Sequence, residues 1–223
     1  MAGVFLMAAR AEVTIWDPLV RIGHWLIVAG FAIDYVTDQP LVLHVWVGYT
    51  VAAIVVLRIL WGFVGSRPAR FHEFVCRPAT VLVYLRDLLL LRSRRYLGHS
   101  PAGGAMVVAL LAMLCATGVT GLLTDGARNH AGPLASWFVT SQSAGAPVAP
   151  QAEWRPYKQV HSLFANLTLV LVGFHVAGVL FASYAHRENL VRAMLTGRKR
   201  QEEPSPATDP GEGSLGSHAV RNR

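Results

Sequence analysis

The sequence predicts an all-α integral membrane protein: a bundle of four spanning helices, with an amphipathic helix at the cytoplasmic surface and one long periplasmic loop. Hydrophobic residues make up 53% of the 223 residues, yet the formal net charge is +7 and the isoelectric point is near 10.0. This combination is typical of a small membrane protein with basic cytoplasmic loops. Four separate apolar stretches also approach the length of about 20 residues that a spanning helix needs.

These four apolar stretches are the expected spans. The first follows Asp17 and Pro18, and proline is favoured at the first position of a helix. Pro40 and Pro156 stand just before the second and fourth stretches, and the third stretch is the most continuously apolar. The four expected spans are residues 19–35, 41–63, 103–123 and 157–184.

The charges of the connecting segments predict the orientation of the bundle. Lysine and arginine are enriched in cytoplasmic loops, which is the positive-inside rule. The segment between the second and third spans and the segment after the fourth are rich in these residues, whereas the opposite side carries few of them. We therefore expect both termini in the cytoplasm and the protein in a bacterial inner membrane. The basic residues are Arg67, Arg70, Arg77, Arg86, Arg92, Arg94, Arg95, Arg187, Arg192, Arg198, Lys199 and Arg200.

The remaining segments complete the organisation of the chain. Residues 78–91 carry too much charge to span and are expected to form an amphipathic helix on the cytoplasmic surface, or equally a cap packed under the bundle. Residues 124–153, rich in alanine, glycine, proline and serine, are expected to form a periplasmic loop that offers a docking surface. The expected domains are a cytoplasmic N-terminal segment at 1–12, a membrane domain at 13–200 and a disordered cytoplasmic tail at 201–223.

Two function classes fit this composition poorly. The basic residues flank apolar spans and do not form one surface stripe, so we expect no nucleic-acid binding. Cys76 lies in an arginine-rich segment and Cys115 inside an apolar span, so a disulfide between them is not expected. Neither cysteine belongs to the CxxCH motif that attaches haem covalently.

Four histidines lie inside the apolar stretches, where histidine is costly and therefore indicates function. They are His24, His44, His161 and His175. His161 and His175 are fourteen residues apart, which in a helix places them within about 40° of one face and roughly 21 Å apart along the axis. His44 matches the depth of His161, and His24 matches the depth of His175. We expect these two pairs to act at two levels of the bundle.

Paired lone histidines at matched depth indicate two bis-histidine haem b groups, bound without covalent attachment. Zinc would require three or four ligands gathered together. A haem with both axial positions filled by histidine has no open site for oxygen or substrate, so its role is electron transfer. For any single one of these histidines, a hydrogen-bonded residue of the bundle is the simpler alternative.

Three basic residues are candidates for contacts with the haem propionates. Arg21 and Lys158 each precede a histidine of the pairs by three residues and so share its helix face. Arg58 follows His44 by fourteen residues and reaches a similar face near the cytoplasmic end. The alternative for all three is simple snorkelling of a long side chain to the membrane interface. The other histidines are expected to be solvated: His72, His99, His130, His186 and His218.

Several separated motifs resemble the bacterial cytochrome b561 family, which includes the b-type cytochrome subunit of nickel–iron hydrogenase. They are VRIGHW around His24, LHVWVGYTVAAIVVLRILWGFVG around His44, GHSPAGGAM before the third span, and HSLFANLTLVLVGFHVAGVLFASYAHRENLVRAMLTGRK from His161 onward. The resemblance covers roughly residues 13–200. It implies a four-helix di-haem b cytochrome that exchanges electrons with quinone, and it places the haem ligands on the same four histidines.

The expected function is therefore electron transfer between the quinone pool and a periplasmic redox protein, such as a hydrogenase or a c-type cytochrome. No catalytic residue is expected if the chain is an electron-transfer subunit; a self-contained quinone-linked oxidoreductase is the alternative within the family. A haem-free transporter is the alternative from another class, although such proteins usually have more spans and internal repeats. Membrane lipid and quinone are the other expected partners, and a homo-oligomer is left open.

Overall fold

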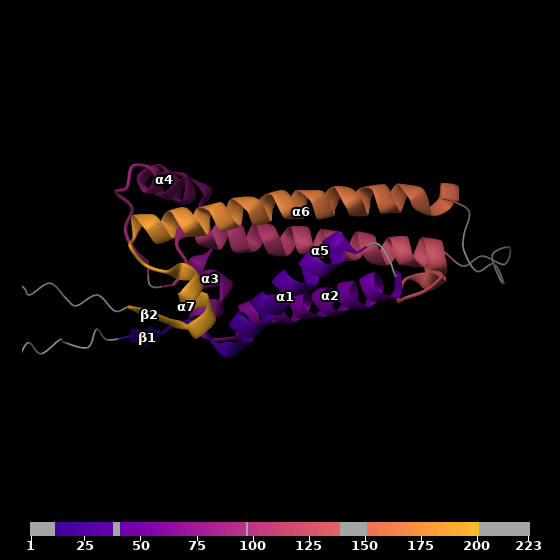
Figure 1. The fold of residues 1–223 in the computed structure, drawn as a ribbon, viewed down its shortest axis with the longest axis horizontal. Helices are drawn as coiled ribbons and strands as arrows, with labels where there is room; N and C mark the ends of the chain where they lie inside the picture. Colours follow the sequence, from indigo (N-terminus) through magenta and orange to yellow (C-terminus); the bar gives the residue numbers. More distant parts are fainter. Residues whose placement is uncertain (1–11, 38–40, 97, 139–150, 201–223) are drawn as a thin grey trace, which may run out of the picture.

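A computed structural model describes residues 12–37, 41–96, 98–138 and 151–200 of the chain. Four long helices run alongside one another and form an elongated bundle (Figure 1). They are α1 (Pro18–Val36), α2 (Leu41–Val64), α5 (Pro101–Asn129) and α6 (Gln151–Ala185). Each is long and apolar enough to cross a membrane. The predicted all-α fold with four spans is therefore confirmed.

The starts of α1 and α5 follow the rules of helix capping. Asp17 is the N-cap of α1, and its carboxylate accepts a hydrogen bond from the Val20 amide at 2.9 Å. Ser100 is the N-cap of α5 and accepts from the Gly103 amide at 3.2 Å. A proline follows each cap, where its missing N–H costs nothing. The sequence therefore sets both helix starts locally.

Two helix boundaries differ from the sequence prediction. Helix α5 continues to Asn129 and ends at His130, whose backbone is left-handed (φ 50°). Helix α6 begins at Gln151, so Pro156 lies inside it and not before it. Residues at both ends of the periplasmic loop expected at 124–153 therefore belong to α5 and α6. Proline is tolerated here because it lies near the helix start, where amide groups lack helical partners.

Close packing of α5 on α6 forms one side of the bundle, and α1 on α2 forms the other. The Thr117 and Thr168 hydroxyls are 3.2 Å apart across the α5–α6 contact, and Thr168 is fully buried. In the other contact, a Cβ on Gly30 would lie 2.5 Å from Val51 Cγ2, so only glycine allows this approach. Small residues and hydroxyl groups commonly join helices within membranes.

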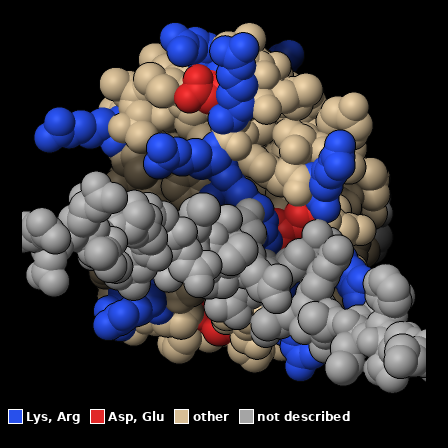
Figure 2. Space-filling model, turned by 90° about the vertical axis from the view of Figure 1, so that its left-hand side faces the viewer, with Lys and Arg blue, Asp and Glu red and all other residues tan. Residues whose placement is uncertain are grey.

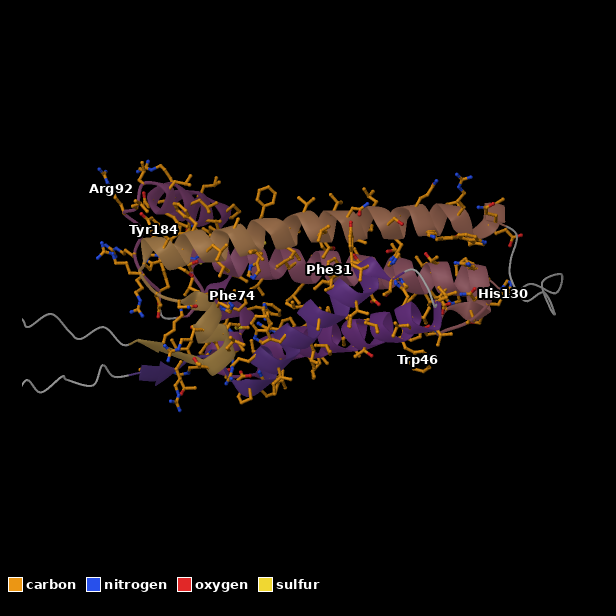
Figure 3. All side chains as sticks on the ribbon, viewed as in Figure 1. Phe31, Trp46, Phe74, Arg92, His130 and Tyr184 are labelled. Carbon is orange, nitrogen blue, oxygen red and sulfur yellow. The ribbon has the colours of Figure 1, made fainter. Side chains whose placement is uncertain are left out.

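The outward faces of the four helices are apolar. Large side chains such as Val56 on α2, Val119 on α5 and Phe174 on α6 are more than half exposed. Side chains project from the bundle along its whole length (Figure 3). Exposed apolar faces on helices with internally paired backbones suit a lipid environment.

One end of the bundle, here called the cap end, carries the shorter elements. These are the turn η1 (Arg67–Ala69), α3 (Phe71–Phe74) and α4 (Pro78–Leu89), which precede α5 in the chain, and α7 (Leu190–Thr196), which follows α6. Strands β1 (Glu12–Thr14) and β2 (Arg198–Arg200) pair antiparallel, so the two ends of the membrane domain meet here. Lysine and arginine side chains gather on this face (Figure 2).

Helix α4 is amphipathic as expected. Tyr84 and Leu88 are buried on the side that faces α5, while Leu82, Val83 and Leu89 are exposed. Its outward apolar side chains and its position at the end of the bundle suit an element at the membrane interface.

The other end, here called the loop end, holds the end of α1, the start of α2 and the short helix η2 (Ala135–Trp137). Phe138 packs edge-on against Tyr157 with ring centroids 5.4 Å apart, which ties the η2 segment to α6. Arg128 lies over the Trp154 ring at 4.7 Å. The first eleven residues and the tail at 201–223 lie outside the described residues, so the expectations for them stay predictions.

Candidate functional site

The structure brings the four membrane histidines together as two pairs. At the cap end, His24 of α1 faces His175 of α6 with ring centroids 6.4 Å apart and ring planes at 60°. At the loop end, His44 of α2 faces His161 of α6 with centroids 6.1 Å apart and planes at 90°. These are the two pairs that the depth of each histidine predicted. Each pair joins α6 to a helix distant in sequence.

The spacing within each pair fits one metal ion between the rings. A histidine nitrogen lies about 2 Å from a metal it ligates and about 1 Å from its own ring centre, so two rings across one metal have centroids about 6 Å apart. The separations of 6.1 and 6.4 Å match this value. No group of three or more His, Cys, Asp or Glu side chains that could hold a metal is found among the described residues. Two axial ligands without further donors suit haem iron.

In the loop-end pair, hydrogen bonds fix the tautomer of both rings. His161 Nδ1 donates to the Thr117 carbonyl at 3.0 Å. His44 Nδ1 donates to the carbonyls of Thr37 at 3.1 Å and Asp34 at 3.2 Å. A carbonyl only accepts, so each Nδ1 carries the proton and each Nε2 keeps its lone pair for a metal. This is the usual way in which neighbouring groups orient a histidine ligand.

Gly121 makes room for the His161 ring on α5. A Cβ at this position would lie 3.2 Å from His161 Cε1, closer than a comfortable contact. The Thr120 hydroxyl lies 3.4 Å from His161 Nδ1 on the same side. The stretch from Thr117 to Gly121 is thus shaped to receive the imidazole.

The cap-end pair is held differently. Within the described part of the chain, neither His24 nor His175 has a hydrogen-bond partner, and His24 Nδ1 is buried without one. Trp25 packs edge-on against His24 with centroids 5.1 Å apart. A buried imidazole nitrogen without a partner is costly unless a further group satisfies it.

The three basic candidates have different surroundings. Arg58 donates to the Ala69 carbonyl at 3.3 Å and lies over the Phe71 ring at 5.7 Å, while its Nη1 is buried without a partner. Arg21 donates instead to the Leu195 carbonyl in the last turn of α7. Lys158 is exposed, one turn before His161 on α6. Arg58 and Arg21 each have a buried guanidinium nitrogen without a partner that could bind a carboxylate at the cap end.

Comparison with known protein families gives a match over most of the chain. The model of the prokaryotic cytochrome b561 family matches residues 15–197, which include both histidine pairs. The chain belongs to this family. It is therefore a membrane cytochrome that binds haem b and transfers electrons. Neither the curated proteins nor the solved structures that were compared with the chain include a match.

Sequence reasoning missed part of the environment of His44 in this cytochrome. The Asp34 carboxylate lies 3.9 Å from His44 Nδ1 and is largely buried. Asp34 is the third residue from the end of α1, where the last carbonyls of a helix lack helical partners. A histidine three residues into the following helix is well placed to meet both the carbonyls and the carboxylate. That proximity of Asp34 and His44 along the chain is the signal that could have identified the contact.

The expectation that His99 is solvated is wrong. Its ring lies between Trp16 and Phe74, with centroids 4.5 and 4.4 Å away, and its Nδ1 is buried without a partner. Burial, followed by the nearby charges of Arg58 and Lys199, lowers the pKa of His99 to about 4. The histidine is therefore a neutral packing residue of the cap end. Its burial could not be predicted because Trp16, which covers it, is 83 residues away in the sequence.

The other loop histidines differ in how far they are buried. Both nitrogens of His130 are buried without partners at the loop end (Figure 3), so the expectation of a solvated ring is wrong. His186 is half-buried, 3.4 Å from the Ser93 hydroxyl. His72 is exposed, as expected. His218 lies outside the described residues.

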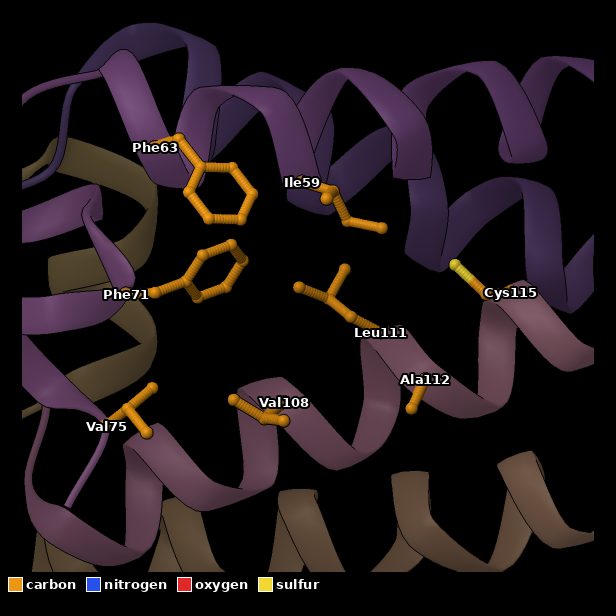
Figure 4. A pocket seen from close by; sticks show the side chains of 8 residues that line it. All are labelled: Ile59, Phe63, Phe71, Val75, Val108, Leu111, Ala112 and Cys115. Atoms are coloured by element: carbon orange, nitrogen blue, oxygen red, sulfur yellow. The ribbon is translucent and has the colours of Figure 1, made fainter.

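An apolar pocket of about 430 Å³ opens between α2, α3 and α5 near the cap end (Figure 4). Phe63 and Phe71 form one wall, and Val108, Leu111 and Cys115 of α5 form another. The lining offers a quinone ring no strong hydrogen-bond donor. The pocket therefore suits a hydrocarbon chain better than a polar head group. Both cysteines of the chain, Cys76 and Cys115, are free.

Proposed function

We propose that this cytochrome holds two haem b groups, one at each histidine pair, and carries electrons along the bundle between a redox protein and the quinone pool. The observation that carries the proposal is the presence of two facing imidazole pairs, 6.1 and 6.4 Å apart, that share helix α6. Their positions on α6 differ by fourteen residues, or roughly 21 Å along the helix. The pairs therefore lie at two levels of one membrane domain, which we assign to residues 13–200.

The chemistry supplied by haem b is reversible one-electron transfer at iron. The residues of this chain contribute the rest. At each level two imidazoles, from His24 and His175 or from His44 and His161, would hold the haem iron and would leave it no position open for a substrate. Rigid helices hold the rings in place, so little rearrangement accompanies a change of charge. The geometry thus supports electron transfer and gives no support to oxygen activation.

Contacts with the haem propionates are the second part of the proposal. Arg58 and Arg21 are the stronger candidates, because each has one guanidinium nitrogen buried without a partner at the cap end. Arg21 shares a helix face with His24 and also donates to the Leu195 carbonyl, as Arg58 donates to the Ala69 carbonyl. Lys158 shares a helix face with His161 and is exposed. Snorkelling to the interface accounts equally well for Arg21 and Lys158.

We further propose that the cap end faces the cytoplasm of a bacterium and that the protein lies in the inner membrane. Support comes from the lysine and arginine side chains gathered at that end (Figure 2) and from the positive-inside rule. The loop end then faces the periplasm. There it would meet a redox protein such as a hydrogenase or a c-type cytochrome, and quinone would exchange electrons from within the membrane.

Replacement of each histidine by alanine tests the two-centre proposal. His44→Ala and His161→Ala should each reduce the haem content from two to one by removing the loop-end centre. His24→Ala and His175→Ala should do the same at the cap end. Haem content and redox titration of the purified variants measure this. His72→Ala is the matched control, because its side chain is 67% exposed and lies outside the four spans. A full haem content in any of the four variants would remove that histidine from the ligand set.

A further inference from the structure

The two histidine pairs have opposite electrostatic surroundings. We infer that the loop-end centre has the lower reduction potential and the cap-end centre the higher. This inference rests on the proposed function, in which each pair holds a haem. It adds the order of the two potentials, which the four ligands alone leave undetermined.

Hydrogen bonds to the imidazoles are the first cause of the difference. Both rings of the loop-end pair donate Nδ1–H to backbone carbonyls, at 3.0 Å for His161 and 3.1 Å for His44. Such a bond increases the electron density on Nε2 and makes the imidazole a stronger donor to a metal. A stronger donor stabilises ferric iron more than ferrous iron, which lowers the reduction potential.

The cap-end pair lacks these hydrogen bonds. Among the described residues, no carbonyl or carboxylate accepts a hydrogen bond from His24 or His175, and Trp25 covers His24 with an aromatic ring. Both imidazoles are therefore weaker donors than those at the loop end. Ferrous iron is therefore favoured more at the cap end than at the loop end.

Charged side chains act in the same direction. The Asp34 carboxylate lies 3.9 Å from His44 Nδ1, and a negative charge so close favours ferric iron at the loop end. At the cap end, Arg21 lies one turn before His24 on α1, and together with the half-buried Arg58 it adds positive charge that favours ferrous iron. Lys158 opposes this order because it lies one turn from His161. Its side chain is exposed, however, so solvent and headgroups screen its charge.

His44 and His161 would hold one haem, and His24 and His175 the other. Each haem would supply reversible one-electron transfer, without bond making or breaking. With the lower potential at the loop end, a single electron shared between the two centres would reside mainly at the cap end.

Redox titration of the full-length holoprotein at pH 8, followed by its visible spectrum, tests this order. Gly121→Ala should push His161 off the Thr117 carbonyl, and Asp34→Asn removes the charge beside His44. Each should raise the lower midpoint and leave the higher one in place. Asp34→Glu keeps the negative charge, so it should leave the lower midpoint near its value in the unmodified protein. Gly118→Ala is the matched control, because a Cβ there meets Ala52 at an ordinary 3.7 Å. Gly121→Ala should also alter the electron paramagnetic resonance signal of one low-spin ferric centre.

The inference is overturned if Gly121→Ala and Asp34→Asn shift the higher midpoint, or if neither variant shifts any midpoint. A single unresolved midpoint in the unmodified protein would overturn it as well. Failure of the proposed function has a different signature, since the holoprotein would then carry fewer than two haems per chain. Asp34→Asn keeps the test decisive if Gly121→Ala does not fold.

Discussion

At the residue scale, backbone groups prepare the loop-end histidines for their role. The Thr37 and Thr117 carbonyls hold the Nδ1 protons of His44 and His161, so that Nε2 points away from these carbonyls. A histidine held in one tautomer needs no rearrangement when a metal binds. At the cap end, the buried and unpartnered Nη1 of Arg58 is a comparable preparation for an anionic group.

The first prediction concerns Arg58. Arg58→Gln keeps much of the reach and polarity of the side chain but removes the charge, so the midpoint of the cap-end centre should fall. The expected size is on the order of 1 kcal/mol, or about 40 mV for one electron. Potentiometric titration measures it, with Arg86→Gln as the control because the Arg86 side chain is 76% exposed. If both midpoints stay fixed, Arg58 has no electrostatic role at the haem.

Sequence reasoning at this scale succeeded where a single helix sets the geometry. The fourteen-residue spacing of His161 and His175 was enough to predict two levels, because a helix converts spacing into position. It failed for His99 and His130, whose burial depends on partners far away in sequence or on the unpredicted extension of α5. No local pattern carries that information.

At the element scale, the cap end is held together by contacts between distant parts of the chain. Arg95 forms a bidentate ion pair with Glu188, with nitrogen–oxygen distances of 2.8 and 3.1 Å. Both side chains are largely buried. Lys199 of β2 reaches the Tyr96 carbonyl at 3.2 Å, and burial lowers the pKa of its ammonium. These contacts fasten the segment before α5 to the segment after α6.

The second prediction is that loss of the Arg95–Glu188 pair loosens the cap end. Arg95→Ala leaves the largely buried Glu188 carboxylate without its arginine, which should cost about 2 kcal/mol of stability. For a protein of this size the apparent melting temperature should fall by about 4–8 °C. Thermal unfolding in detergent measures it, and Arg86→Ala is the control for an exposed pair. An unchanged melting temperature would show that the pair contributes nothing to stability.

The third prediction is a pH dependence that arises from His99. Its pKa is about 4 in the folded protein and about 6.5 when unfolded, so below pH 6.5 the unfolded state binds a proton that the folded state does not. Stability should be complete above pH 6.5 and fall by up to about 3 kcal/mol toward pH 4. Melting temperatures across this range should fall less steeply in His99→Gln than in the unmodified protein. The exposed His72→Gln is the control, and equal slopes for all three proteins would contradict the account.

The carboxylate of Asp17, also at the cap end, affects the stability of the protein in a lower pH range. Burial alone would raise the pKa of Asp17, but hydrogen bonds from Ser66, Val20 and Trp61 hold it below its usual value. The stability that Asp17 contributes is therefore lost as the pH falls below about 4. The part of the decline between pH 6.5 and 4 that is lost in His99→Gln can thus be assigned to His99 and not to Asp17.

Element boundaries were predictable where capping residues or long apolar runs mark them. Asp17 and Pro18 predicted the start of α1 to within one residue. The ends of α5 and α6 at the loop end extend into polar sequence, so hydropathy placed them about six residues too early or too late. The three-residue strands and α7 were missed because so short an element has no periodic pattern, and the β1–β2 pairing joins residues nearly 190 apart.

At the scale of the whole molecule, four apolar helices and one strongly basic end define a membrane protein with a preferred orientation.

The fourth prediction is that a reporter fused after Gly132 behaves as periplasmic, whereas reporters fused after Arg92 or Arg200 behave as cytoplasmic. The physical reason is that clustered arginines resist translocation. A periplasmic signal from the Arg92 fusion would invert the orientation and exchange the faces that the two centres serve.

The central claim is that one chain holds two haem b groups between its histidine pairs. The pyridine haemochrome spectrum of the purified holoprotein, set against its protein concentration, tests this most directly. The account predicts a b-type spectrum and two haems per chain, since the pairs at 6.1 and 6.4 Å are equally suited to one iron each. One haem per chain would show that a pair serves another purpose, and a colourless protein would contradict the account altogether.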